Sequence, residues 1–314
     1  MKESRNNHWS QFWAHGHMTS LPRSLENNYE GEFAQFWTQQ FSALGEGSAI
    51  LDVCSGNGAI ALLAARHSRS RSKKLQIMAT DAADISPEAL KAHRPEWATT
   101  LDLIRFIPNT RLETLTLLED SVDLCVSQFG FEYSDWSKTS DVLYRLVRSG
   151  GCFAMICHAQ DSSLARTVEK NLSELDTVCQ LVAFADQDKL ATDPQARRNF
   201  LFHLKDAVDE INRLFLIDRQ SSLLADSGML LEKILKRCVI DFSTGMQQFV
   251  QFRSDSEMSR GTVEDLASVI DRFRAQDCWY QPLIDSGFAL TFKGEICFLE
   301  NEKAGDALVF SKPK

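Results

Sequence analysis

Several features that would assign this chain of 314 residues to a particular protein class are missing. Its eight cysteines include no Cys-x-x-Cys pair, so neither a zinc knuckle nor a disulfide framework is predicted. No apolar run is long enough to cross a bilayer, and the first residues lack the apolar core of a signal peptide. We therefore expect a soluble cytoplasmic protein with reduced thiols, with neither a membrane partner nor a metal site.

An excess of positive charge is also missing. The formal net charge is −9, which argues against general binding to nucleic acid, because phosphate binding needs a basic surface. The one basic run is "RHSRSRSKK", residues 66–74. We interpret it as a solvated helix end and loop, with contact to an anionic partner as the alternative.

What the sequence does contain is an alternation of apolar strand patterns with helical patterns. Strands are predicted at 48–54, 74–81, 101–108, 121–130 and 151–159, with helices at 59–68, 86–97 and 138–150 between them. Such alternation predicts an α/β fold with a doubly wound, mostly parallel sheet. Residues 162–252 are mostly helical in pattern, a further helix is predicted at 262–276, and two final strands separated by a short polar turn predict an antiparallel C-terminal hairpin.

The first strand leads into a loop with few side chains, "DVCSGNG". Gly56 and Gly58 allow a backbone to lie against a ligand, and Asp81, which ends the second strand, suits the two hydroxyls of a ribose. An adenosine-containing cofactor is therefore predicted. A dinucleotide fingerprint would place a third glycine where Ala61 stands, and Asp52 would repel a pyrophosphate but can bind an ammonium group. A nicotinamide-dependent oxidoreductase remains the alternative from another class.

"AILDVCSGNG" resembles the first motif of the class I S-adenosylmethionine-dependent methyltransferases, with Cys54 where the first glycine is usual. Three later segments are also similar to motifs of that family, in the family's order. They are "IMATD", which contains Asp81, "EDSVDLCVSQFGFEY" and "LVRSGGCFAMI". The resemblance implies a seven-stranded sheet, S-adenosylmethionine as cofactor, Asn109 and Thr110 beside the adenine, and an N-terminal tyrosine, Tyr29, over the methionine end. The cofactor-binding residues predicted in this way are Tyr29, Asp52, Cys54, Ser55, Gly56, Gly58, Asp81, Ala82, Asn109, Thr110, Ser127, Gln128 and Phe129.

Methyl transfer from a sulfonium needs alignment and exclusion of water, and it needs a base only when the acceptor arrives protonated. The residues predicted to face the acceptor, or to act in catalysis, are His17, Glu132, Tyr133 and His158. Other interpretations stay open: His158 as a satisfied strand-end histidine, Glu132 as the anchor of a cationic substrate, and Tyr29 as an ordinary core or surface residue. His15 and His17 lack a third ligand, so a metal pair is not favoured.

The predicted division has four parts: an N-terminal helical lid (1–44), the cofactor-binding core (45–160), a helical cap inserted between strand five and the last helix (161–255), and the completion of the core (256–314). A cap would enclose a small-molecule acceptor, which is the first hypothesis. A protein or peptide acceptor docked on the insertion is the second. Because "FLFHLKDAVDEINRLFLI" is amphipathic, a homodimer formed through the insertion is a further hypothesis. A binding-only relic of the fold is disfavoured, because a relic would be free to lose Asp52 and Asp81.

Overall fold

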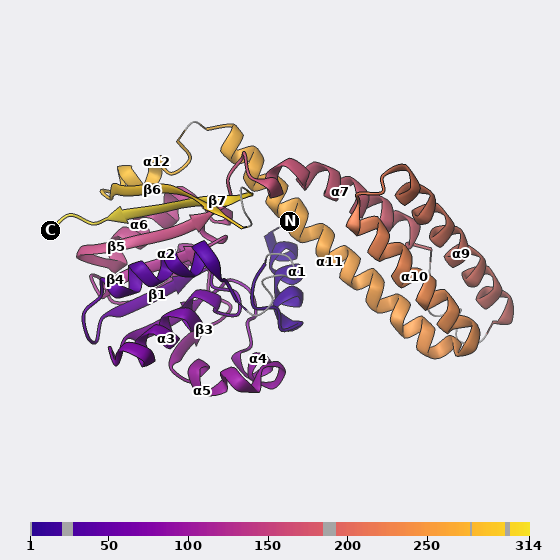
Figure 1. Ribbon diagram of the computed structural model, residues 1–314, viewed down its shortest axis with the longest axis horizontal. Coiled ribbons are helices and arrows are strands. Elements are labelled where there is room, and N and C mark those ends of the chain that lie inside the picture. Colours follow the sequence, from indigo (N-terminus) through magenta and orange to yellow (C-terminus); the bar gives the residue numbers. More distant parts are fainter. Residues whose placement is uncertain (1, 21–27, 185–192, 277, 299–301) are drawn as a thin grey trace. The chain divides into compact units, whose positions relative to one another are not determined.

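A computed structural model describes residues 2–20, 28–184, 193–276, 278–298 and 302–314 (Figure 1). The chain separates into two compact units, residues 1–166 with 267–314, and residues 167–266. The first unit is built on a seven-stranded sheet in the order β3-β2-β1-β4-β5-β7-β6. Its strands are β1 (Ala49–Val53), β2 (Gln76–Thr80), β3 (Ile104–Ile107), β4 (Val122–Gln128), β5 (Val147–Cys157), β6 (Ala289–Cys297) and β7 (Lys303–Ser311).

The pairing of the strands confirms the predicted sheet. Strands β1 to β5 pair in parallel, whereas β7 runs antiparallel to both β5 and β6. All five residues of β1 are buried, as expected for a central strand covered on both faces. The chain order reverses direction at β1, where β2 lies on one side and β4 on the other. Ligands of doubly wound sheets bind at the carboxyl edge beside such a reversal.

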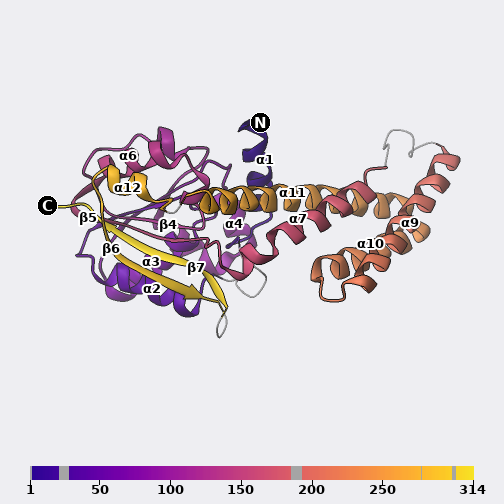
Figure 2. The ribbon, with the colours of Figure 1, turned by 90° about the horizontal axis from the view of Figure 1, so that it is seen from above.

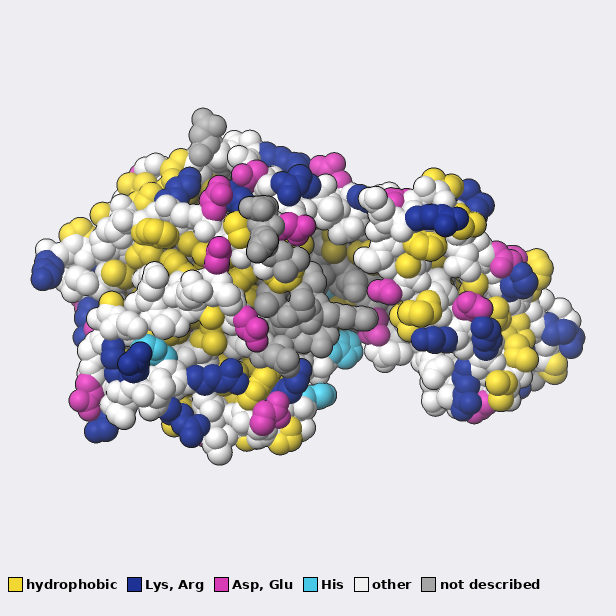
Figure 3. Space-filling view, viewed as in Figure 1, with side chains coloured by type: hydrophobic (Ala, Val, Ile, Leu, Met, Phe, Trp, Pro, Cys, Tyr) yellow, Lys and Arg dark blue, Asp and Glu magenta, His cyan; other side chains and the backbone are white. Residues whose placement is uncertain are grey.

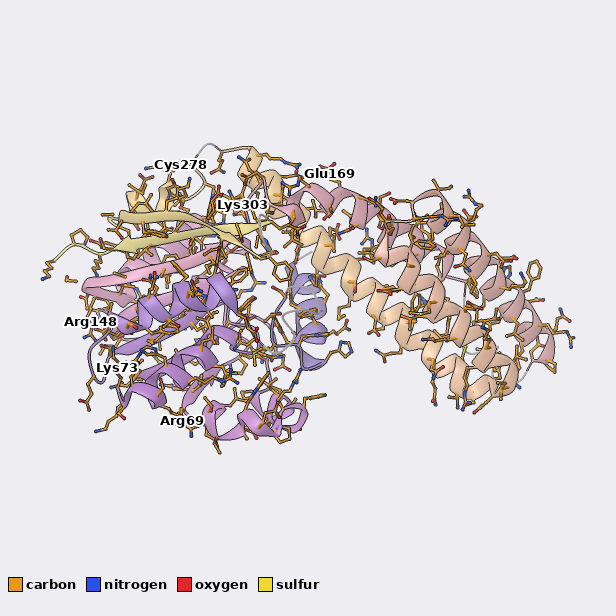
Figure 4. All side chains as sticks on the ribbon, in the orientation of Figure 1. Arg69, Lys73, Arg148, Glu169, Cys278 and Lys303 are labelled. Carbon is orange, nitrogen blue, oxygen red and sulfur yellow. The ribbon has the colours of Figure 1, made fainter. Side chains whose placement is uncertain are left out.

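Helices cover the two faces of the sheet. Helices α2 (Gly31–Ser42) and α3 (Ala59–Arg71) lie on one face, and α6 (Trp136–Leu146) and α12 (Gln281–Asp285) lie on the other (Figure 2). Lys73, labelled in Figure 4, follows α3 and donates hydrogen bonds to the carbonyls of Phe41, Ser42 and Leu44 at the end of α2. This lysine joins the ends of the two helices and satisfies carbonyls that have no partner within α2.

Shorter helices connect the strands near the carboxyl edge. They are α4 (Pro87–His93), η2 (Pro95–Trp97), α5 (Ala98–Leu101), η3 (Leu112–Thr114) and η4 (Phe131–Tyr133). Helix α4 begins as predicted, because Ser86 Oγ accepts a hydrogen bond from the backbone nitrogen of Ala89 and proline occupies the first turn. Helix α1 (Lys2–Ala14) precedes the sheet.

One boundary differs from the prediction. The helix expected at 138–150 ends at Leu146, and β5 already begins at Val147. Gly150 therefore lies inside the strand, with a φ of 76°, next to a shift of register between β4 and β5. A strand that contains such an irregularity has no clean alternation of apolar residues, so its first residues read as a continuation of the helix.

The second unit consists of helices, as the sequence predicts. They are α7 (Ser163–Leu181), α9 (Pro194–Ile217), α10 (Ser222–Ile240) and α11 (Phe242–Arg274), of which α7 and α11 continue into the first unit. Its core contains Phe200, Leu204, Ile211, Leu231 and Phe249. The helix predicted at 262–276 is the last part of α11 rather than a separate element. The predicted four-part division and the predicted role of 161–255 as a cap stay predictions.

In the part of the chain that the structure describes, no helix combines the length and the apolar character needed to span a bilayer.

Candidate functional site

Asp52 lies near the end of β1 and is only 1 % exposed. Its Oδ2 accepts a hydrogen bond of 2.9 Å from the backbone nitrogen of Ala61, in the first turn of α3. Its Oδ1 is buried and has no hydrogen-bond partner among the described residues. Burial, and to a smaller extent the charge of Asp81, raise the pKa of Asp52 to about 8. Among the described residues, the fold thus holds a buried carboxyl group with one oxygen left unsatisfied.

The loop after β1 bends in a way that few side chains tolerate. Gly56, Gly58 and Cys54 have φ angles of 51°, 82° and 53°, all in the left-handed region. A methyl group on Gly56 would lie 2.3 Å from the indole of Trp13, and one on Gly58 would lie 2.8 Å from the ring of Phe106. Only glycine therefore fits these two positions without displacement of a neighbour.

Asp81 follows β2 and fixes the same loop. Its Oδ2 accepts a 2.7 Å hydrogen bond from the nitrogen of Gly56, and its Oδ1 accepts one of 2.8 Å from the nitrogen of Ala83. Ser55 is held on the same side, since its nitrogen donates to the carbonyl of Thr80. Burial raises the pKa of Asp81. The backbone nitrogen of Ala82 also donates to this carboxylate, whose two oxygens together can accept about four hydrogen bonds, so it has room for a further donor such as a hydroxyl.

The structure places Asn109 and Thr110 beside the Asp81 loop. The Thr110 nitrogen donates to the carbonyl of Asp81, at 2.7 Å, and the nitrogen of Asn109 donates to the carbonyl of Ala83. The Asn109 side chain is exposed and donates to Asp84 Oδ1 at 2.9 Å. Ala82 lies between these contacts and is half-buried. The three predicted residues therefore line one loop, with the Asn109 amide turned to a neighbouring carboxylate.

The end of β4 brings three more predicted residues to this edge. Ser127 Oγ accepts a hydrogen bond from the nitrogen of Phe131, and Gln128 Oε1 accepts one from Trp37 Nε1. Gln128 Nε2 is buried and has no partner among the described residues. Phe129 has a φ of 52° although it is not glycine. A bulky residue in the left-handed region costs free energy, and such strain clusters at functional sites.

Tyr29 is 4 % exposed and lies among the groups just described. Its hydroxyl interacts with Ser20 and Gln128, and the charge of Asp52 acts on it, while burial is the main cause that raises its pKa. Its ring lies 6.4 Å from that of Phe129. The N-terminal segment thus brings this tyrosine to the carboxyl edge of β1 and β4.

Glu132, Tyr133 and His158 form a cluster beyond β4 and β5. Glu132 Oε1 accepts a 2.9 Å hydrogen bond from the nitrogen of His158, and the Tyr133 hydroxyl lies 3.1 Å from His158 Nε2. Burial raises the pKa of Glu132 to about 7 and lowers that of His158 to about 3. His158 Nδ1 is buried without a partner among the described residues, and the ring stacks on Phe129 at 4.6 Å. The structure brings these three predicted residues together.

The thiol of Cys54 lies close to the carboxyl groups described above, and their charges act on it. The charges of Asp81, Glu132 and Asp52 all add to burial in raising its pKa well above the usual value. A buried thiol of this kind stays protonated and is a poor nucleophile. Cys54 therefore contributes shape to the loop rather than reactivity.

Helix α1 covers the glycine loop through residues that sequence reasoning missed. The indole of Trp13 lies against Gly56, and Asn57 Nδ2 donates to the carbonyls of Trp13 and His17, at 2.9 and 2.7 Å. Trp9 meets the ring of Tyr133 edge-on. Asn57 could have been chosen from the sequence, because it lies inside the glycine loop. Trp13 could not, because no sequence pattern pairs it with a residue 43 positions away.

The predicted catalytic residue His17 lies just after α1, which ends at Ala14. Its side chain is exposed and stacks on Phe12 at 4.5 Å, with His15 edge-on at 6.1 Å. Within the described ranges, no three His, Cys, Asp or Glu side chains converge as metal ligands would.

Comparisons with known proteins bear on this edge of the sheet. A model of the ubiE/COQ5 methyltransferase family matches residues 32–169, less than half of the chain. Among curated proteins, none matches the sequence.

Three solved structures are similar to parts of the chain. Geranyl diphosphate methyltransferase in complex with GPP and sinefungin is 16 % identical, with a TM-score of 0.33, over 40 % of this chain and 43 % of that one. Geranyl diphosphate C-methyltransferase from Streptomyces coelicolor A3(2) is 14 % identical, with a TM-score of 0.33, over 40 % and 42 %. Haemonchus contortus phosphoethanolamine N-methyltransferase 2, in complex with S-adenosyl-L-methionine, is 12 % identical, with a TM-score of 0.41, over 99 % and 57 %.

The match thus spans less than half of the geranyl diphosphate methyltransferase chains. The family model, by contrast, covers β1 to β5 and the loops that hold Asp52, Asp81 and Glu132. The family match therefore agrees with the resemblance to class I S-adenosylmethionine-dependent methyltransferases predicted from the sequence, and it lies over the part of the chain that holds the predicted cofactor residues.

Proposed function

We propose that the chain transfers the methyl group of S-adenosylmethionine to a small-molecule acceptor at the carboxyl edge of β1, β2 and β4. Asp52 would bind the ammonium of the amino-acid end, and Asp81 would bind the ribose hydroxyls. Asn109 and Thr110 would lie beside the adenine. When bound, the cofactor supplies an activated methyl group and a sulfur that leaves neutral, so the chain does not need to provide an acid.

The observation that carries this proposal is the unpaired carboxyl group of Asp52. A buried carboxylate without a cation is costly, and its raised pKa expresses that cost. A ligand with an ammonium and a sulfonium group supplies the positive charge that the site lacks. A dinucleotide brings two negative phosphates instead, which Asp52 and Asp81 would repel. The charge of the site thus favours the sulfonium cofactor over a nicotinamide one.

Calorimetry with S-adenosylhomocysteine and with NAD tests the cofactor class. We expect binding of the first in the micromolar range and no binding of the second, and the reverse would end the methyltransferase proposal. Asp81→Ala should weaken S-adenosylhomocysteine binding by about 1–3 kcal/mol, because hydrogen bonds to a charged group are lost. Asp141→Asn, an exposed change on α6, is the matched control and should bind as the wild type does.

On the acceptor side, the chain offers Glu132, Tyr133 and His158. Since its pKa is lowered to about 3, His158 is neutral and can exchange a hydrogen bond with the Tyr133 hydroxyl. The buried, partnerless Nδ1 of His158 is a second polar atom that an acceptor can satisfy. Glu132 holds the backbone of His158 and orients it. We propose that Tyr133 and His158 position the acceptor and that Glu132 positions His158.

The N-terminal segment would act as a cover for the cofactor. Asn57 ties the end of α1 to the glycine loop, and Trp13 lies on Gly56, so α1 already closes that part of the edge. Tyr29, which contacts Gln128, would complete the cover at the methionine end. Asn57→Ala removes both hydrogen bonds of the tie, and we expect faster dissociation of S-adenosylhomocysteine in stopped-flow measurements. An unchanged rate would show that α1 does not gate the cofactor.

The alternative acceptor is a protein or peptide side chain. Labelled methyl groups from S-adenosylmethionine, offered with a cell extract, separate the two cases by size. Label in the small-molecule fraction supports the first acceptor class, and label confined to polypeptide supports the second.

A further inference from the structure

Helices α9 and α10 form an antiparallel pair joined by residues 218–221, and they lie side by side in Figures 1 and 2. Each packs one apolar face into the core of the helical unit. Each also carries large apolar side chains on the opposite, exposed side. They are Phe202, Leu216 and Ile217 on α9, and Met229, Leu230, Val239 and Ile240 on α10, with 44–79 % of each exposed. Figure 3 shows hydrophobic side chains alternating with charged ones on the visible face of this unit.

Four of these seven residues (Phe202, Leu216, Met229 and Ile240) belong to two regular stripes. On α9 the exposed positions Phe202, Asp206, Asp209, Arg213 and Leu216 follow one another at intervals of four and three. On α10 the exposed positions Asp226, Met229, Lys233, Lys236 and Ile240 do so at intervals of three and four. This spacing keeps side chains on one face of a helix and is the spacing of helix–helix interfaces. A helix with apolar residues on two opposite faces is expected to be covered on both.

The charges of the two stripes are complementary in position. Asp206 lies eleven residues before the end of α9, and Lys233 lies eleven residues after the start of α10. Arg213 and Asp226 are each four residues from the same two helix ends. Because both helices rise equally per residue, the members of each pair lie at the same level along the hairpin. An acidic residue of one helix is therefore level with a basic residue of the other in two places. In the first pair the acid is on α9, and in the second it is on α10.

We propose that this face of α9 and α10 docks on the same face of a second copy of the chain. A two-fold axis parallel to the helices places α9 of each copy against α10 of the other and keeps the levels unchanged. Asp206 then meets Lys233 of the partner copy, Arg213 meets its Asp226, and the apolar members of both stripes lie in the same seam. The result is an antiparallel four-helix arrangement with an apolar seam and complementary charges. Asp209, Lys236 and Arg213 also pair along their own helices, with Lys205, Glu232 and Glu210, so Asp206 and Lys233 are the charges of the stripes that depend most on the partner copy.

Sedimentation velocity of the full chain over a wide concentration range tests the proposal. We expect a dimer that dissociates on dilution. The double variant with Phe202→Glu and Leu216→Glu should raise the dissociation constant by about a hundredfold or more, since two apolar anchors are replaced by like charges. Leu118→Glu is the matched control, because it changes an equally exposed apolar residue of the other unit and should leave the dimer intact. Far-UV circular dichroism of each variant reports whether the helices have formed.

A charge swap tests the partner and the register. Asp206→Lys should weaken the dimer severalfold, and adding Lys233→Asp to the same chain should restore it, because in a homodimer both members of the pair are exchanged. A wild-type chain that stays monomeric at every concentration would overturn the proposal. So would a dimer that is indifferent to the double variant, or one that the swap fails to restore.

Discussion

Carboxylates in the two units of the molecule have opposite surroundings. At the carboxyl edge of the sheet, Asp52 and Glu132 are about 1 % exposed, and burial raises the pKa of both. In the helical unit, Glu210, Glu232 and Glu257 lie at the surface beside cations of their own helices. Burial makes the first arrangement costly, although backbone hydrogen bonds and the charge of Arg272 offset part of that cost for Glu132, whereas the second keeps charge in water at little cost.

Backbone conformation shows the same contrast. Cys54, Asn109 and Phe129 have positive φ angles in the first unit, at the ends of β1, β3 and β4. Among the described residues of 167–266, no non-glycine residue has a positive φ. Other non-glycine residues with positive φ lie elsewhere in the first unit, such as Ser72 and Asp120, but the strained ends of β1, β3 and β4 are those that lie beside the buried carboxyl groups. This edge of the sheet is where we place the chemistry.

The largest effect on the proposed site is expected from a substitution at Gly56. Gly56→Ala adds a methyl group 2.3 Å from the Trp13 ring at a φ of 51°, so both the loop and α1 must move. We expect S-adenosylhomocysteine binding to weaken by about a hundredfold in calorimetry, the consequence of roughly 3 kcal/mol of overpacking and strain.

Gly47→Ala is the control for backbone strain alone. Its φ is 75°, but nothing lies within 4 Å of the added methyl group. Stability should fall slightly while affinity stays at the wild-type value. Equal loss of affinity in the two variants would show that the strain of a positive φ, rather than contact with the loop, decides binding.

The strands of the sheet and the glycine loop could be predicted because they depend on local patterns. Buried apolar runs, two glycines and the aspartates at strand ends identified β1, β2 and the Asp52 and Asp81 positions. The bend of β5 at Gly150 could not be predicted, because its helix-like spacing outweighs a register shift that only the neighbouring strand imposes.

The composition of the site was harder to predict than its position. Tyr133 and His158 were chosen as strand-end residues, but their mutual contact depends on the turn at η4, which has no distinctive sequence signal. Trp13 was missed because its partner, Gly56, becomes a neighbour only after α1 docks. Contacts made across long sequence separations between aromatic rings leave no periodicity behind.

Tyr133→Phe sharpens the comparison within the first unit, since it removes one hydroxyl without changing the ring. We expect kcat to fall by about tenfold to a hundredfold, because His158 loses its hydrogen-bonding partner and the acceptor loses its orientation. The affinity for S-adenosylhomocysteine should not change. Tyr280→Phe, elsewhere in the same unit, is the matched control. A Tyr133→Phe enzyme with normal kcat would remove Tyr133 from the acceptor side.

Asp52→Asn tests the cost of the buried charge. In the wild type, the folded state holds the Asp52 proton up to about pH 8, whereas the unfolded chain releases it near pH 3.8. The stability that this group contributes is therefore present below pH 3.8 and is lost as the pH rises towards 8. In thermal unfolding without ligand, the variant should not show the part of the loss of stability with rising pH that Asp52 causes.

The same substitution separates stability from binding. S-adenosylhomocysteine should bind the wild type more tightly as the pH rises to 8, because its ammonium needs the ionised carboxylate, and the Asn variant should show no such gain. Asp141→Asn, which changes an exposed aspartate on α6, should reproduce the wild-type profile. A variant with an unchanged pH profile would mean that Asp52 is not the group that meets the ligand.

The smallest change in stability is expected from removing a surface charge in the helical unit. Arg253 lies 3.7 Å from Glu257 along α11, and the Glu257 side chain is 62 % exposed. Because water screens such a pair, Arg253→Ala should change the free energy of unfolding by no more than about 0.5 kcal/mol in urea titrations. It should leave the pH profile of stability unchanged. A loss of unfolding free energy as large as that caused by a change at Asp52 would show that charges in the helical unit also stabilise the fold. The proposed difference between the two units would then be wrong.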